Sequence, residues 1–223
     1  MIDKKKSMTC IAVIKGRNGK LIMAGDRRAS WHFGHAEKMN RPKIAAVKNG
    51  ARLDANENLL KSGDILLGAT GNGSMCSLLV DILDVPEIQG DVQHYMFFTF
   101  REKIQRLLLN QGYGDKEKNL FIPPDSSCEL VVGIKGHIYT VNVDNPYDDS
   151  IREFHSSRGG LIQIDEVSAP YATGCGGPSA LPILLAEKKR EKCSKKEHLQ
   201  LAMEIAADIS PGCDRNIDYV REE

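Results

Sequence analysis

The chain has 223 residues, and its 30 lysines and arginines balance its 30 aspartates and glutamates. A chain of this length can bury one sizeable core, and a net charge of zero provides no field that would attract nucleic acid or an anionic membrane. Residues 1–8 are polar and basic, and no run approaches the ~18 apolar residues of a membrane span. We therefore expect a single cytoplasmic domain, with neither nucleic acid nor a membrane as partner.

The cysteines and histidines do not form a recognisable metal motif. Six cysteines are scattered without a Cys-x-x-Cys pair, at Cys10, Cys76, Cys128, Cys175, Cys193 and Cys213. This spacing disfavours a zinc ribbon and a disulfide framework, so we expect reduced thiols, mostly in the core. His32 and His35 have a ligand-like spacing, but no further ligand is evident nearby. We expect neither a metal nor a cofactor.

The first third of the chain predicts strands. Two apolar runs, 9–14 and 20–26, flank a turn that begins and ends with glycine, which is typical of a β-hairpin. A further strand is expected at 43–47, followed by a turn and a polar segment at 51–63. A buried-strand pattern then covers 64–71.

Helices and strands alternate in blocks after this point. Apolar positions at helical spacing predict one helix from about Met75 to Pro86 and a second over 92–111. After a loop at 113–127 come a hairpin and two more strands, at 129–134, 137–143, 161–164 and 169–173.

Two helices close the chain. One opens after a glycine-rich turn at 174–177, with Pro178 suited to a first helical position. The other starts at a capping box formed by Ser194 and Glu197 and stops before Pro211, leaving a short tail. The order is strands, two helices, strands, two helices, without a repeat. This order predicts an α+β protein, and its connectivity is compatible with stacked antiparallel sheets between two helical layers.

A threonine, an aspartate and a lysine occur in a distinctive order near the start. Thr9 opens the first strand, the hairpin closes on Asp26 within Ala-Gly-Asp, and Lys43 heads the third strand. On Asp26 and Lys43 alone, a partly buried salt bridge is the simpler interpretation. With Thr9 and an intervening Arg-Ala-Ser, the order resembles the proteasome β-subunit and HslV peptidase family. That resemblance implies a four-layer αββα sandwich, the Ntn-hydrolase fold, over residues 9–223.

Threonine needs a nearby base to become a nucleophile. If the chain began at Thr9, its own α-amino group, with a reference pKa of about 7.7 to 8.0, could take the hydroxyl proton. An intact bond to Met8 turns this amine into a non-basic amide. Lys43 near the hydroxyl would favour its deprotonated form, and Asp26 would hold the lysine charged.

The resemblance implies further site residues. Gly71 matches the glycine whose backbone N–H stabilises the tetrahedral oxyanion, although a flexible turn is an equally simple explanation. Cys175, Asp208 and Ser210 match positions around the terminal amine. Cys175 replaces the usual serine and is a weaker hydrogen-bond partner, and Ser210 is one residue short of the common spacing.

Substrate contacts are also implied. Arg28, Ala29 and Ser30 resemble the strand whose backbone pairs with an extended peptide. Ala29, Ala69 and the loop at Trp31 would shape the pocket for the side chain before the cut. Because Ala69 is small, large apolar side chains are expected there.

Residues 1–8 would have to be removed. Relatives free their threonine after a glycine or by removal of a methionine, and position 8 is methionine. Either the working chain starts at Met8, or residues 1–8 are a propeptide cut by another active site.

The leading interpretation is a threonine endopeptidase subunit of a self-compartmentalised double ring, hexameric or heptameric, that degrades unfolded proteins. An ATP-dependent unfoldase is implied as partner by the resemblance. Two alternatives stay open: a catalytically silent ring subunit of the same fold, and a small-molecule Ntn amidase.

Overall fold

The computed structural model describes residues 9–30, 36–38, 42–54, 61–115, 120–121, 128–144, 161–186 and 194–223. The expected leader 1–8, the pair His32 and His35, Trp31 and Cys193 lie outside the described residues. In that described part, no helix is both long enough and apolar enough to cross a membrane.

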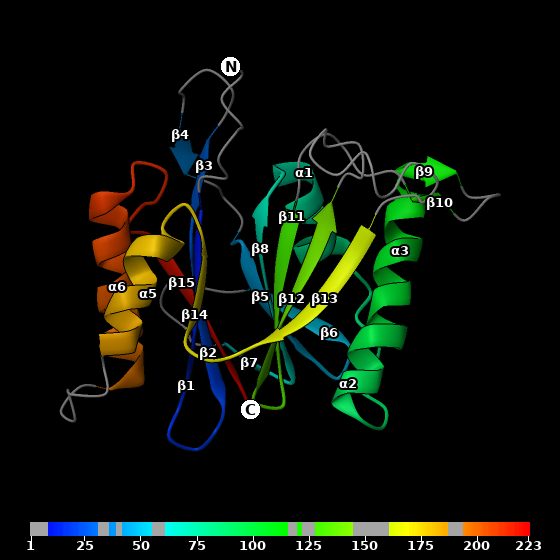
Figure 1. The fold of residues 1–223 in the computed structure, drawn as a ribbon, viewed down its shortest axis with the longest axis horizontal. Helices are drawn as coiled ribbons and strands as arrows, with labels where there is room; N and C mark the ends of the chain where they lie inside the picture. Colours follow the sequence, from blue (N-terminus) through cyan, green and yellow to red (C-terminus); the bar gives the residue numbers. More distant parts are fainter. Residues whose placement is uncertain are drawn as a thin grey trace, which may run out of the picture.

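Two sheets face each other in the centre of the protein (Figure 1). The five-stranded sheet has the order β14-β1-β2-β15-β7, and the six-stranded sheet has the order β13-β12-β11-β8-β5-β6. The five-stranded sheet consists of β1 (Cys10–Lys15), β2 (Leu21–Asp26), β7 (Lys61–Gly63), β14 (Tyr171–Gly174) and β15 (Ile217–Glu222). The six-stranded sheet consists of β5 (Ile44–Lys48), β6 (Ala51–Asp54), β8 (Ile65–Gly71), β11 (Cys128–Ile134), β12 (His137–Asp144) and β13 (Leu161–Val167).

Two short ribbons add to these sheets, β3 (Arg28–Ser30) with β4 (Ala36–Lys38), and β9 (Gly114–Asp115) with β10 (Leu120–Phe121). Helices cover the outer faces (Figure 1). Beside the five-stranded sheet lie α5 (Gly177–Leu185) and α6 (Lys195–Ile209). Beside the six-stranded sheet lie α1 (Gly73–Ser77), the π-helical η1 (Leu78–Ile82), α2 (Val92–His94), η2 (Tyr95–Phe100) and α3 (Arg101–Asn110).

Three apolar clusters follow from the alternation of side chains along the strands. Ile11 and Val13 of β1 pack between the sheets, whereas Cys10 and Ala12 pack against α5 and α6. A third cluster lies between the six-stranded sheet and its helices. Because strand side chains alternate with period two, Thr9 shares the inter-sheet face with Ile11. This alternation directs the threonine toward the six-stranded sheet.

Most of the expected elements are confirmed, and the α+β class with them. β1 and β2 form the first hairpin, and β11 and β12 form the second. The capping box of α6 is present in both directions, with Ser194 accepting from the Glu197 N–H and the Glu197 carboxylate accepting from the Ser194 N–H. The sequence did not predict β6 and β7, which lie in the segment described as polar at 51–63. The loop expected at 113–127 contains the short strands β9 and β10, so that prediction was wrong.

The predicted C-terminal tail is also wrong, because it forms β15, between β2 and β7. Two of its inward-facing residues carry carboxylates, so this segment lacks the apolar alternation by which a buried strand is recognised in a sequence. Asp218 is fully buried and pairs with the Arg27 guanidinium through bonds of 2.7 and 2.6 Å. Glu222 accepts a hydrogen bond of 2.9 Å from the Leu21 N–H. Partners distant in sequence therefore make this strand possible.

Candidate active site

The backbone of Thr9 is held by the turn that follows β14. The Gly176 N–H donates to the Thr9 carbonyl oxygen at 3.4 Å. Gly174 has a φ of +81°, and a Cβ on it would lie 2.1 Å from that same oxygen. A side chain at position 174 would therefore displace Thr9.

Lys43 joins Thr9 to Asp26 across the two sheets. Its Nζ donates to Thr9 Oγ1 at 2.7 Å and to Asp26 Oδ1 at 3.2 Å, and also to the carbonyl oxygen of Arg28. Thr9 is 6% exposed, Lys43 9% and Asp26 0%. A hydroxyl, an ammonium and a carboxylate therefore converge in a nearly dry site, as the sequence order predicts. In such a site electrostatic interactions are stronger than in water.

The Asp26 carboxylate is anchored by backbone groups as well. It accepts hydrogen bonds from the N–H of Cys10 at 2.9 Å and the N–H of Arg28 at 3.2 Å. Burial raises the pKa of Asp26 above its ordinary value, while the Lys43 charge and the two N–H groups oppose that rise. The carboxylate is thus oriented by the strand backbone on either side of it.

A cluster of thiols lies behind Thr9. The Thr9 N–H donates to Cys175 Sγ at 3.2 Å, and that sulfur lies 3.5 Å from Cys213 Sγ. The hydrogen bond with Cys213 and burial raise the pKa of Cys175 well above its ordinary value, while a hydrogen bond with Ser210 opposes the rise. A hydrogen bond with Cys10 and burial raise the pKa of Cys213 to about 12, with the Cys175 contact opposing. Both thiols are therefore neutral near pH 7.

Gly71 ends β8 in a conformation that suits glycine. Its φ is +115°, and the next residue, Asn72, caps α1 by accepting from the Met75 N–H at 3.1 Å. The strand therefore turns into a helix at this residue. Ala69, expected in a substrate pocket, is 1% exposed and belongs to the cluster beneath the helices of the six-stranded sheet. Its role in a pocket stays a prediction.

Asp208 and Ser210, the two residues predicted to support the Thr9 amine at the end of α6, lie in different surroundings. Ser210 is buried and contacts Cys175. The Asp208 side chain is 54% exposed, and both its oxygens accept from Arg215, at 2.6 and 2.7 Å. Its carboxylate is thus directed to solvent and to Arg215. The predicted substrate-binding residues Arg28, Ala29 and Ser30 form strand β3. The Arg28 guanidinium donates a hydrogen bond to the Cys213 carbonyl oxygen at 3.3 Å.

Sequence reasoning missed a polar group beside this site. Glu129 of β11 accepts hydrogen bonds from the hydroxyls of Tyr171 and Thr173 on β14, both 2.5 Å long. One signal was available, since Glu129 interrupts the apolar run of its strand. Its partners lie more than forty residues away, so the sequence did not identify them.

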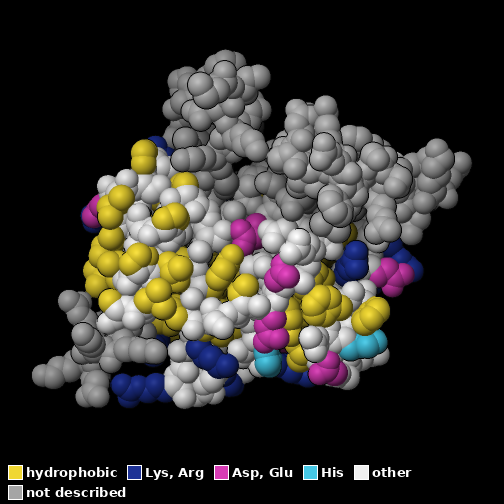
Figure 2. Space-filling view, in the orientation of Figure 1, with side chains coloured by type: hydrophobic (Ala, Val, Ile, Leu, Met, Phe, Trp, Pro, Cys, Tyr) yellow, Lys and Arg dark blue, Asp and Glu magenta, His cyan; other side chains and the backbone are white. Residues whose placement is uncertain are grey.

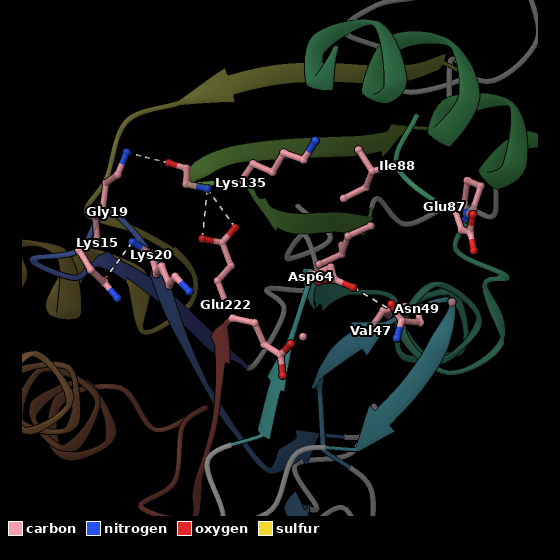
Figure 3. Close-up of a pocket in the computed structure, with 17 residues that line it drawn as sticks. Lys15, Gly19, Lys20, Val47, Asn49, Asp64, Glu87, Ile88, Lys135 and Glu222 are labelled. Atoms are coloured by element: carbon pink, nitrogen blue, oxygen red, sulfur yellow. Dashed lines mark hydrogen bonds between the residues drawn. The ribbon is translucent and has the colours of Figure 1, made fainter. Parts of the chain in front are cut away.

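A groove lies at the opposite end of the two sheets from Thr9. A groove of about 740 Å³ is lined there by residues including Lys15, Lys20, Asp64 and Glu222 (Figure 3). None of the residues predicted to be catalytic lines it. We therefore place the candidate active site at Thr9 and not in this groove.

Fold and site geometry together define a protein with the proteasome and HslV fold. BPH from Thiobacillus denitrificans, in complex with epoxomicin, is 17% identical, covers 96% of this chain and 98% of its own, and has a TM-score of 0.62. HslV from Trypanosoma brucei is 17% identical over 96% of this chain and 99% of its own, with a TM-score of 0.54. Anbu from Hyphomicrobium sp. strain MC1 is 13% identical over 96% of this chain and 82% of its own, with a TM-score of 0.53. No protein-family model and no curated protein matches the chain. The resemblance seen in the sequence is thus confirmed as a fold.

Proposed function

We propose that this chain is a threonine endopeptidase in which Thr9 becomes the nucleophile once residues 1–8 are removed. The observation that carries the proposal is the Lys43 ammonium, 2.7 Å from Thr9 Oγ1 and 3.2 Å from buried Asp26. An ordinary ion pair would not need a hydroxyl in contact with its cation. A cation at this distance favours the deprotonated oxygen, which is the attacking species.

The reaction follows from these positions. With Thr9 at the chain start, its neutral α-amino group takes the proton from Oγ1, which attacks the scissile carbonyl. The tetrahedral oxyanion accepts a hydrogen bond from the Gly71 N–H. The leaving amine takes the proton from the α-ammonium, and water then hydrolyses the ester on Thr9. Cys175 and Ser210 position the amine, since the Thr9 nitrogen already contacts Cys175 Sγ.

Substrate and assembly are part of the same proposal. An unfolded peptide would pair with the backbone of β3, at Arg28–Ser30. The apolar clusters on both sides of each sheet support the expected four-layer αββα sandwich. Each helical layer also exposes large apolar side chains, Ile82 and Phe98 on one and Leu185 and Ile209 on the other. Figure 2 shows hydrophobic side chains gathered over the α5 and α6 side. These exposed apolar side chains support contacts between subunits. The proposal extends them to stacked hexameric or heptameric rings in the cytoplasm, with an ATP-dependent unfoldase as partner, as the family resemblance implies.

Three forms of the chain test the proposal. One starts at Thr9 after cleavage of a removable fusion, one retains residues 1–8, and one starts at position 9 with Thr9→Ala. We expect hydrolysis of a fluorogenic peptide and of an unfolded protein by the first form alone, with inhibition by epoxomicin. Intact mass of protein from its native host gives the true first residue. Turnover that survives Thr9→Ala would falsify the proposal.

One observation favours a second function, a catalytically silent ring subunit. Asp208, expected to support the amine side of Thr9, is paired with Arg215 instead. An assembled chain that starts at Thr9 and hydrolyses no peptide supports this alternative. Particle size, measured by light scattering, separates both ring forms from a single-particle amidase.

A further inference from the structure

The groups of the proposed reaction are divided between the two sheets. Thr9 immediately precedes β1 and Asp26 ends β2 of the five-stranded sheet, whereas Lys43 leads into β5 and Gly71 ends β8 of the six-stranded sheet. The 2.7 Å contact between Thr9 Oγ1 and Lys43 Nζ therefore depends on the spacing of the sheets at this end. The apolar cluster between the sheets resists their separation but is not directional. A polar contact is needed to define the spacing more closely.

Near Thr9, the carboxylate of Glu129 bridges the gap between the sheets. Glu129 of β11 accepts from the Tyr171 hydroxyl at Oε1 and from the Thr173 hydroxyl at Oε2, each at 2.5 Å. Both donors lie on β14, so both bonds run from one sheet to the other. Hydrogen bonds to an ionised acceptor are short, directional and roughly twice as strong as neutral ones.

The bridge ends next to the reacting groups on both sides. Glu129 is paired with Thr70 in β8, the residue before the proposed oxyanion donor. Thr173 is followed by Gly174, whose backbone packs on the Thr9 carbonyl. The Glu129 carboxylate therefore connects β14, whose last residue packs on Thr9, to β11, the neighbour of the strand that ends at Gly71.

We propose that Glu129, through Tyr171 and Thr173, is a positioning residue that sets the sheet spacing at Thr9. The inference rests on the proposed function and extends it. Displacement of a reacting group by about 1 Å can cost about 10²-fold in rate, so partial loosening of this bridge reduces kcat while leaving peptide binding along β3 intact. KM is therefore unchanged.

Two substitutions and their combination test the bridge. Glu129→Gln keeps the shape but removes the charge and one acceptor, and Thr173→Val removes one donor. Glu129→Gln weakens both charge-assisted bonds and Thr173→Val removes one of them, so each lowers kcat about tenfold with KM unchanged. Because both substitutions act on the same carboxylate bridge, their effects do not add, and the double variant is at most about twofold slower than the slower single variant.

A matched control exists at the other end of the molecule. Glu222 of the five-stranded sheet accepts from the Leu21 N–H at 2.9 Å. It also accepts from the N–H of Gly136, in the turn between β11 and β12, at 3.0 Å (Figure 3). It is likewise a carboxylate that links the sheets, but far from Thr9. Glu222→Gln lowers Tm and leaves kcat unchanged.

The outcomes separate the inference from the function on which it rests. If the chain starting at Thr9 is active and Glu129→Gln lowers Tm but not kcat, the bridge is merely structural and the inference is overturned. If that chain is inactive, the proposed function fails, and crystal structures decide the inference. A Thr9 Oγ1 to Lys43 Nζ separation that lengthens in Glu129→Gln but not in Glu222→Gln supports it. An unchanged separation overturns it.

Discussion

The two ends of the sandwich use the same kind of residue for different purposes. At one end, buried Glu222 is satisfied by backbone N–H groups of Leu21 and Gly136. At the other, buried Asp26 is bonded to the Lys43 ammonium, whose nitrogen also contacts a threonine hydroxyl. A buried carboxylate bound by backbone groups holds strands together. One bound by a side-chain cation next to a hydroxyl can prepare that hydroxyl for reaction.

The largest effect is expected for Lys43→Ala. It removes the cation from the hydroxyl and leaves Asp26 buried without its ionic partner. We expect peptide hydrolysis to fall on the order of 10³-fold and unfolding free energy to fall by about 3 kcal/mol. Lys15→Ala at the other end, which removes an exposed donor to the Gly136 carbonyl, serves as the control. It should change stability by less than about 1 kcal/mol and leave kcat/KM unchanged. Comparable activity of the two variants would contradict the assignment.

Alkylation rates test the thiols behind Thr9. Raising the pKa of Cys213 from 9.0 to about 12 lowers its thiolate fraction near pH 8 by about a thousandfold. Iodoacetamide should therefore label Cys213 at least about 10³-fold more slowly in the folded chain than in urea, as read by peptide mass spectrometry. The folded rate should rise about tenfold per pH unit. Equal labelling rates of Cys213 in the folded and unfolded chains would show that this thiol is neither protected nor held neutral by the fold.

Two glycines with the same φ angle, one at each end of the sandwich, allow the two ends to be compared by substitution. Gly174 and Gly19 both have a φ of +81°, but a Cβ would lie 2.1 Å from the Thr9 carbonyl in one case and 3.9 Å from a flexible Lys15 carbon in the other. Gly19→Ala should lose about 1 kcal/mol of stability from backbone strain, and Gly174→Ala should lose more, because its Cβ also clashes with a backbone oxygen. Gly174→Ala should also lower kcat by about 10²-fold, because it displaces Thr9. Equal kcat in both variants would show that Thr9 placement does not limit the reaction.

The smallest effect is expected for Cys175→Ser. A hydroxyl is a stronger hydrogen-bond partner than a thiol, so the serine should hold the Thr9 amine better and raise kcat by about threefold, while Cys175→Ala lowers it by a similar factor. Both are measured on the chain that starts at Thr9. If serine and alanine behave alike, the side chain at 175 does not position the amine.

The hairpin, the second hairpin and the capped last helix were predictable because their signals are local. Turn glycines and a capping box act over a few residues. The order of Thr9, Asp26 and Lys43 also pointed to the site, since it resembles a family in which those positions react together. β15 was not predictable in this way, because its inward Asp218 and Glu222 look like surface residues until Arg27 and Leu21 supply their partners.

Local pattern thus determined the kinds of most elements and their order, and the resemblance of the sequence to a known family indicated the candidate nucleophile with its lysine and aspartate. Tertiary structure alone decided that Asp208 turns to Arg215, that Ser210 meets Cys175 and that Glu129 joins β11 to β14. The reason is physical. A strand or helix is specified by neighbours within a few residues, whereas a buried polar group is stable only where groups from distant strands satisfy it.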